Sequence, residues 1–248
     1  MTTSILLSTS CQVVILGIIL ASIDDFPKSK QVRYLKFRSF IVLTGDNFVE
    51  FFIACMLLCL EYLHKNAILH RDIKPENLVF DENGYLRITD LGIARLWNPE
   101  NSKDTSGTPG YMAPEVMCRQ NHGVAVDYFA MGVIAYECMF GKRPYHGKDR
   151  KEIRDHILSK QVKIREAEIP RNWSTQAADF INRLIQRKPG NRLGKEGPQV
   201  LKDHEWFRGF NWDALYNKTI KAPFVPPQSE DNFDAKYTNS EWKDANSE

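Results

Sequence analysis

Residues 70–95 read HRDIKPENLVFDENGYLRITDLGIAR and hold two short apolar segments on either side of one turn. Residues 78–80 and 86–89 have the composition of strands, and the Asp-Glu-Asn-Gly between them is typical of a hairpin turn. Such a hairpin returns the chain to its starting point. The sequence therefore predicts that Asn77, before the first strand, and Asp90, after the second, lie at the same end.

Three polar side chains in this stretch suit the transfer of a phosphoryl group. Such a reaction requires little covalent chemistry from the protein, which aligns a hydroxyl group with the phosphate and neutralises charge with magnesium. Asp72 can accept the proton of the hydroxyl and orient it. Asn77 and Asp90 offer the amide and carboxylate oxygens that suit Mg²⁺.

Further motifs extend the pattern in a fixed order. One His-Arg-Asp or one Asp-Leu-Gly would be weak evidence, but coincidence does not explain their joint occurrence with later motifs. The chain resembles the serine/threonine protein kinases, which implies an α+β fold with a mainly helical large lobe, a smaller β lobe, and ATP and Mg²⁺ as cofactors. The matching residues are His70, Arg71, Asp72, Lys74, Asn77, Asp90, Gly92, Gly107 to Tyr111, and Ala113 to Glu115.

The resemblance assigns roles to residues at the predicted site. It implies that Asp72 is the catalytic base and that Lys74 lies beside the transferring phosphoryl group. It also implies that Thr108 forms hydrogen bonds with both Asp72 and Lys74. Asn77 and Asp90 would hold Mg²⁺, with Val79 and Asp90 contributing to the ATP site. One departure is Leu91, where the family usually has Phe. Because leucine is still apolar, we expect it to pack beneath the position that a small-lobe helix takes in the family, a helix expected to be missing here, and Asp90 to keep its role.

Other residues match structural positions of the family. Glu115 and Arg192 match a buried ion pair between the substrate platform and a later helix. Asp127 matches the aspartate that anchors the backbone around His70 and Arg71 from the start of a central buried helix.

The segment from Asp90 to Glu115 corresponds to the activation segment. Asp104 stands where the kinases most like this chain carry a regulatory phosphothreonine, and Arg71 is its expected partner. One hypothesis is that Asp104 gives Arg71 a weak constitutive counter-charge, with Thr105 or Ser106 as secondary phosphosites. The alternative is an ordinary solvated aspartate.

Motifs after the lobe resemble the tail of cAMP-dependent-type kinases, the AGC group. They are His204 to Phe207, Lys221 to Pro227 and Asp231 to Asp234. Glu76 and Glu137 match two glutamates that bind arginines before the phosphorylated serine. A substrate that is basic before its Ser or Thr acceptor is therefore expected, the alternative being two ordinary surface glutamates.

The start of the chain does not match the small lobe, which binds ATP in this family. A small lobe needs roughly 60 to 70 residues at ordinary element and loop lengths, yet only 47 precede Phe48. Gly17 and Gly45 are the glycines available there, so no Gly-x-Gly-x-x-Gly can form. In the family, the lysine that binds ATP follows an apolar-Ala-apolar sequence, and none of the lysines in this region does. We therefore expect the small β lobe to be mostly missing.

The domain organisation follows from these matches. Residues 1–30 form an atypical N-terminal segment, 31–209 the kinase large lobe, and 210–248 the AGC-like tail. Three interpretations remain for the apolar run from Val13 to Leu20: a buried strand followed by a hinge, a membrane or signal segment, or an extension foreign to the fold.

Composition indicates a cytoplasmic globular protein. The chain has 248 residues, is 43% hydrophobic and 26% charged, and carries a net charge of +2. Its Lys and Arg residues are scattered, which predicts no nucleic-acid binding. We expect a monomer without membrane attachment, and the five cysteines look like core residues rather than a disulfide framework.

Hydrophobic periodicity predicts the main helices of the lobe. They span residues 49–64, 127–139, 151–159, and a segment from Ser174, as its cap, to Gln186. Two functions remain: an active serine/threonine kinase, or an impaired, kinase-derived interaction module or fragment without the ATP loop and lysine.

Overall fold

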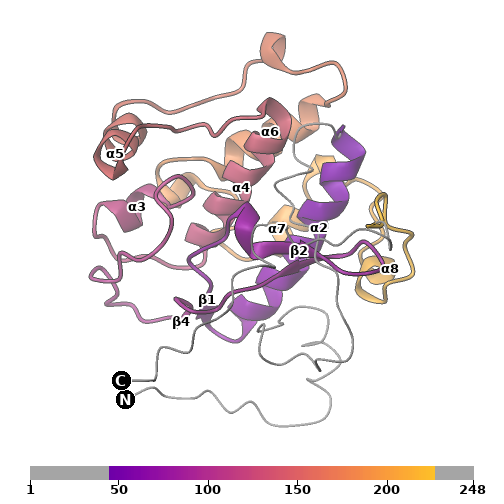
Figure 1. The fold of residues 1–248 in the computed structure, drawn as a ribbon, viewed down its shortest axis with the longest axis horizontal. Coiled ribbons are helices and arrows are strands. Elements are labelled where there is room, and N and C mark those ends of the chain that lie inside the picture. Colours follow the sequence, from indigo (N-terminus) through magenta and orange to yellow (C-terminus); the bar gives the residue numbers. More distant parts are fainter. Residues whose placement is uncertain (1–44, 227–248) are drawn as a thin grey trace, which may run out of the picture.

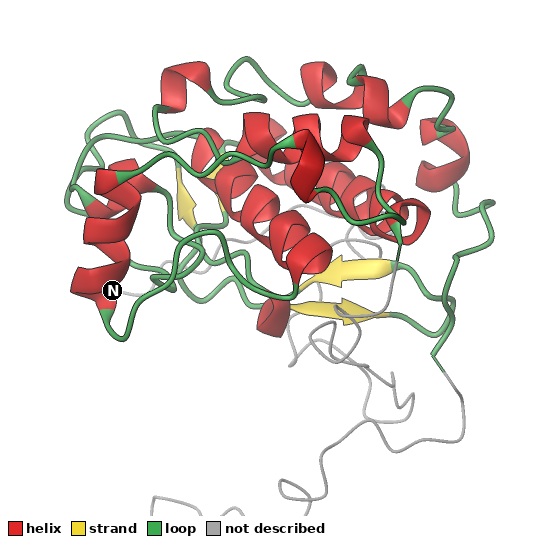
Figure 2. Cartoon of the chain, turned by 90° about the horizontal axis from the view of Figure 1, so that it is seen from above, coloured by secondary structure: helices red, strands yellow, loops and turns green. Residues whose placement is uncertain are grey.

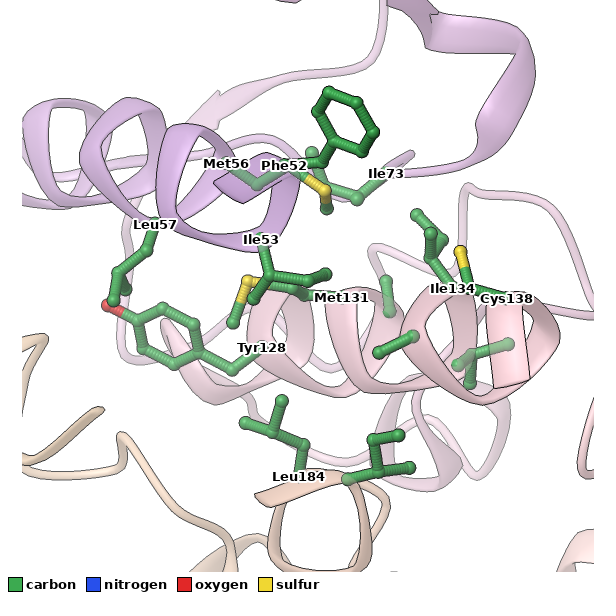
Figure 3. Close-up of a cluster of buried hydrophobic side chains, with 14 of the residues drawn as sticks. Phe52, Ile53, Met56, Leu57, Ile73, Tyr128, Met131, Ile134, Cys138 and Leu184 are labelled. Carbon is green, nitrogen blue, oxygen red and sulfur yellow. The ribbon is translucent and has the colours of Figure 1, made fainter. Parts of the chain in front are cut away.

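Three helices form the centre of the part of the chain described by this computed structural model, residues 45–226 (Figure 1). Helix α2 (Asp46–Lys65) packs against α4 (Ala125–Phe140), and α6 (Thr175–Leu184) covers the opposite side of α4 (Figure 3). The predicted helices at 49–64 and 127–139 are thus confirmed, each slightly longer than expected.

Helix α2 is buried along its length because apolar side chains recur every three or four residues. Phe52, Ile53, Met56 and Leu57 are at most 1% exposed, and they face α4 or Ile73 in the core (Figure 3). In length and composition α2 could cross a membrane, and it alone among the described helices could do so. However, 61% of its apolar window is buried inside the protein, as expected of a core helix.

The predicted hairpin forms from β2 (Leu78–Phe80) and β3 (Leu86–Ile88), which pair antiparallel with Val79 opposite Arg87. Gly84 closes the turn in the left-handed region at φ 83°, where a side chain would be strained. The Thr89 N–H and hydroxyl both donate to the Asn77 carbonyl, at 2.9 and 3.2 Å. These bonds bring the two ends of the hairpin together.

A second antiparallel pair, which the sequence did not predict, joins β1 (Ile68–Leu69) to β4 (Arg95–Leu96). Figure 2 shows the two small sheets as separate pairs of strands. Strands of two residues carry no detectable periodicity, so only the fold reveals them. This pair places the segment after Asp90 beside the loop that carries Asp72.

The remaining elements surround these helices. Helix α5 (Arg150–Ser159) confirms the predicted helix at 151–159, and Ser174 caps α6 by accepting from the Ala177 N–H at 3.0 Å. Helix α6 ends at Leu184, two residues before the predicted end. The others are η3 (Pro75–Asn77), α3 (Pro114–Met117), η4 (Glu166–Glu168), η5 (Pro189–Asn191), α7 (Gln199–Lys202), η6 (Glu205–Phe207) and α8 (Trp212–Tyr216).

The start of the predicted tail lies against the hairpin. The Phe224 ring packs on Phe80 with centroids 5.4 Å apart, and the Tyr85 hydroxyl donates to the Ile220 carbonyl. The predictions for residues 1–30, for the small lobe and for the tail after 226 lie outside the described residues.

Candidate active site

The loop after β1 is held by a buried carboxylate on the first turn of α4. Asp127 is 1% exposed and accepts hydrogen bonds from the backbone N–H groups of His70 and Arg71, at 3.0 and 2.8 Å. Arg71 has φ 68°, a conformation that costs a non-glycine residue energy and persists only when its surroundings enforce it. Asp127 supplies that constraint and so fixes the position of Asp72.

Asp72 lies at the centre of a hydrogen-bonded group. Its Oδ1 accepts from the Thr108 hydroxyl at 2.7 Å and from the Thr108 N–H at 3.1 Å. Its Oδ2 accepts from Lys74 Nζ at 2.6 Å and from Asn77 Nδ2 at 3.3 Å. Lys74 Nζ also donates to the Thr108 hydroxyl at 3.1 Å. All four residues predicted to be catalytic therefore meet, although Thr108 is 36 positions from Asp72 in the sequence.

The environment of Asp72 keeps its carboxylate ionised. Partial burial by itself would raise its pKa, but the hydrogen bonds from Lys74 and Thr108 and the charge of Lys74 outweigh burial. The pKa of Asp72 therefore lies below its ordinary value. For the buried His70, desolvation lowers the pKa despite nearby Asp127, so its imidazole favours the neutral form. Its Nδ1 accepts from the Asp72 N–H at 3.3 Å, which requires a neutral ring, and its Nε2 can then donate to the Thr89 carbonyl at 3.2 Å.

The chemistry of Asn77 and Asp90 fits Mg²⁺. Asn77 uses its Nδ2 to donate to the Asp72 carbonyl at 2.9 Å, which leaves its amide oxygen as a ligand atom. Asp90 is exposed next to the hairpin end, and its Oδ1 accepts from the Gly92 N–H at 3.0 Å. Residues 45–226 contain no group of three or more His, Cys, Asp or Glu that could hold a metal. An ion bound here would need phosphate or water oxygens to complete its coordination.

Two residues predicted near the nucleotide differ in burial. Val79 is 8% exposed on β2, whereas Leu91 is 40% exposed. Leu96 and Trp97, farther along the same segment, are 61% and 49% exposed. The packing expected for Leu91 is therefore incomplete among the described residues.

The activation segment brings Asp104 to Arg71. Arg71 Nη1 lies 3.3 Å from Asp104 Oδ2, but it is buried without a well-formed hydrogen bond. The other guanidinium nitrogens donate to the Ile93 carbonyl, Nε at 2.9 Å and Nη2 at 2.5 Å. Thr105, which with Ser106 is one of the two predicted secondary phosphosites, uses its carbonyl to accept from Arg150 Nη2 at 3.1 Å. Asp104 is thus an incomplete partner for Arg71.

A pocket of about 570 Å³ lies beside the catalytic group. Its lining includes Lys74, Asn77 and Thr108 together with both predicted substrate-binding residues, Glu76 and Glu137. Sequence reasoning found Tyr111 in a matching motif but gave it no role, although its hydroxyl donates to Glu137 Oε2 at 2.6 Å. It also missed the basic residues of the lining, Lys142 and Arg143. A separate apolar cavity of about 220 Å³ between α2 and α8 contains none of the predicted site residues.

The fold and this site define a protein kinase, and comparison with known families agrees. The family model described as a protein kinase domain matches residues 29–207, so the chain belongs to the protein kinase family. Within that family it resembles the AGC serine/threonine kinases, as the motifs predicted.

Three relatives illustrate the similarity. Human ribosomal protein S6 kinase alpha-6 is 35% identical over 210 residues, covering 82% of this chain and 28% of the relative. Isozyme 1 of the cGMP-dependent protein kinase of Drosophila melanogaster is 40% identical over 185 residues, 73% of this chain and 24% of the relative. A cAMP-dependent protein kinase catalytic subunit-like protein of Caenorhabditis elegans is 34% identical over 84% of this chain and 52% of the relative. The chain therefore spans between about a quarter and a half of these relatives.

Proposed function

We propose that this chain transfers the γ-phosphate of ATP to a Ser or Thr hydroxyl of a protein substrate. The observation that carries the proposal is the contact group of Asp72, Lys74, Asn77 and Thr108, anchored through Asp127. An ionised Asp72 orients the substrate hydroxyl and accepts its proton, and Lys74 places a positive charge beside the same carboxylate. Asn77 and Asp90 would hold Mg²⁺, which would neutralise charge at the phosphates.

The substrate class follows from the pocket next to this group. Glu76 and Glu137 line it together with Tyr111. Two carboxylates beside the acceptor position attract guanidinium groups, since carboxylates pair with arginine in a bidentate geometry. A protein substrate with arginine before its Ser or Thr is therefore the proposed partner.

A second candidate function is a kinase-derived interaction module that does not catalyse phosphate transfer. The observation that favours it is that residues 1–47 contain only Gly17 and Gly45, so they hold no Gly-x-Gly-x-x-Gly. In this case the same pocket would bind a partner protein without phosphorylating it.

The deciding experiment measures transfer of labelled phosphate from Mg-ATP to an arginine-containing serine peptide. Wild type is compared with Asp72→Asn and with Asp155→Asn, a control on an exposed face of α5. We expect transfer by wild type and by the control, and none by Asp72→Asn. If wild type shows neither transfer nor a thermal shift with Mg-ATP, the proposed activity is wrong for this chain, which is then a fragment or an interaction module.

A further inference from the structure

The pocket beside the catalytic group has a charge distribution that two glutamates alone do not explain. Glu76 and Glu137 contribute two negative charges, whereas Lys74, Lys142 and Arg143 contribute three positive ones. Lys74, however, is paired with Asp72 at 2.6 Å. Lys142 and Arg143 therefore remain as the cations that balance the two glutamates, with His146 also in the lining. A cation held close to these carboxylates makes the pocket attract a substrate arginine less strongly than its carboxylates alone would.

The position of Arg143 in this pocket is defined by its neighbours Tyr111 and Gly110. Its guanidinium lies over the Tyr111 ring, 5.5 Å from the centroid, in cation–π geometry. It also fills the space where Gly110 has no side chain, because a Cβ at residue 110 would lie 1.6 Å from Arg143 Nη1. Gly110 thus leaves room for the guanidinium.

Tyr111, whose ring lies beneath Arg143, is hydrogen-bonded to Glu137, the carboxylate proposed to bind a substrate arginine. Tyr111 donates its hydroxyl to Glu137 Oε2 at 2.6 Å. Burial first, and then the bond and charge of Glu137, raise the pKa of Tyr111, so this hydroxyl stays a donor. Arg143, Tyr111 and Glu137 therefore form one unit. A guanidinium that approaches Glu137 meets a fixed like charge beside it.

We propose that Arg143 is a specificity residue that acts as an internal competitor for substrate arginine at Glu137 and Tyr111. The proposal rests on the proposed function, since it concerns the same pocket and the same substrate class. Arg143 weakens selection for arginine before the substrate serine, because its like charge repels a second guanidinium next to Glu137. The chain therefore tolerates substrates with fewer basic residues than Glu76 and Glu137 alone would select.

The test measures equilibrium binding of fluorescent serine peptides to the full chain, which requires no catalysis. One peptide carries arginine at the second and third positions before the serine, and its partner carries alanine there. We expect Arg143→Ala to bind the arginine peptide up to about fivefold more tightly than wild type, as for a partly solvated charge. Binding of the alanine peptide should stay within twofold.

Two further variants separate a specific effect from a general one. Gly110→Ala keeps the arginine but forces its guanidinium out of position, so it should tighten binding of the arginine peptide in the same direction. Lys142→Ala removes an exposed positive charge from the same pocket and should change binding by less than about twofold. An equal gain from Lys142→Ala would overturn the proposal, because the effect would then be one of net charge.

The outcomes also distinguish this inference from the proposed function. If wild type transfers phosphate but Arg143→Ala does not increase the preference for arginine, the inference about Arg143 is wrong and the kinase assignment stands. If the arginine peptide binds neither wild type nor Arg143→Ala, both the internal competition and the basic-substrate assignment are wrong.

Discussion

Arg192 and Glu115 form a two-pronged ion pair in the interior, 77 positions apart in the sequence. Nη1 donates to Oε1 at 2.6 Å and Nη2 to Oε2 at 2.9 Å, and the two residues are 1% and 2% exposed. The guanidinium also donates to the Ala125 carbonyl at 2.9 Å and lies over the Phe129 ring. The pair therefore joins the end of the activation segment to α4 and to the loop after α6.

Replacing Arg192 should destabilise the fold rather than report on catalysis. Arg192→Ala leaves Glu115 buried without its partner, which typically costs about 3 to 5 kcal/mol. Urea denaturation measures the loss. Arg183→Ala is the control, since it breaks a surface pair with Asp179 and should cost less than about 1 kcal/mol. Equal losses for the two variants would show that burial does not govern the Arg192 pair.

Asp127→Asn should loosen the loop that carries Asp72. Asp127 Oδ1 accepts from Arg71 and Oδ2 from His70 and from His64 Nε2, the last at 2.8 Å. An asparagine has one acceptor oxygen, so its NH₂ group would oppose at least one buried donor. An unsatisfied buried group costs about 1 to 3 kcal/mol. Denaturation measures this loss, and hydrogen exchange at His70 and Arg71 should accelerate. Unchanged exchange at both amides would contradict the anchoring role.

Sequence patterns were sufficient for the main helices and for the hairpin that brings Asn77 near Asp90. The helices α2, α4 and α5 followed from periodicity, and the hairpin from its Asp-Glu-Asn-Gly turn. Thr108 could be placed beside Asp72 only through family motifs. No local pattern links two residues 36 positions apart, because their contact depends on how the activation segment folds back.

Long-range polar contacts escaped the sequence analysis for the same reason. Asp81 reads as a turn residue, yet it is 1% exposed and pairs with Arg87 at 2.9 Å and with Lys218 at 3.1 Å. It thereby ties the hairpin to the tail. The contact of Arg143 with Tyr111 likewise depends on the space left by Gly110. Such pairings are set by tertiary packing, on which hydrophobic periodicity carries no information.

Thr108 should tune the acidity of the base. Burial alone would raise the pKa of Asp72. The hydrogen bonds from Thr108, together with Lys74, outweigh burial and hold this pKa below its ordinary value. Thr108→Val removes the hydroxyl, so the pKa of Asp72 rises and a larger fraction is protonated at a given acidic pH. The acidic limb of the pH–rate profile for phosphate transfer should move to higher pH, with kcat lower by about tenfold. Thr108→Ser keeps the hydroxyl and should keep the wild-type limb. Identical limbs in all three proteins would exclude this role.

Asp104 should act as a weak partner of Arg71. Its side chain is 47% exposed and its contact with Nη1 is 3.3 Å, so Asp104→Ala should cost less than about 1 kcal/mol of stability. We nevertheless expect faster proteolysis of the activation segment and less phosphate transfer, because Arg71 would lose its counter-charge there. Glu100→Ala, an exposed change in the same segment, is the matched control. Unchanged proteolysis and transfer in Asp104→Ala would identify Asp104 as an ordinary solvated residue.

Glu50 should make the stability of the fold depend on pH. Burial, and then the charge of Asp46 one turn earlier on α2, raise its pKa from 4.5 to about 7. The folded state therefore binds the Glu50 proton more tightly than the unfolded state does. This contribution to stability is complete below pH 4.5 and is lost as the pH rises to about 7.

The variant Glu50→Gln tests this dependence. It should match wild type near pH 4.5 and exceed it at pH 8 by about 1 kcal/mol, since partial exposure screens the effect. Glu61→Gln on the same helix is a control in which the pKa shift, and therefore the expected change in stability, has the opposite direction. For Glu61, burial is outweighed by the hydrogen bonds and charges of Lys202 and Lys65, which lower its pKa. Its replacement should therefore destabilise the protein at pH 8. Urea denaturation at the two pH values measures both variants, and a loss of stability in Glu50→Gln at pH 8 would contradict the raised pKa.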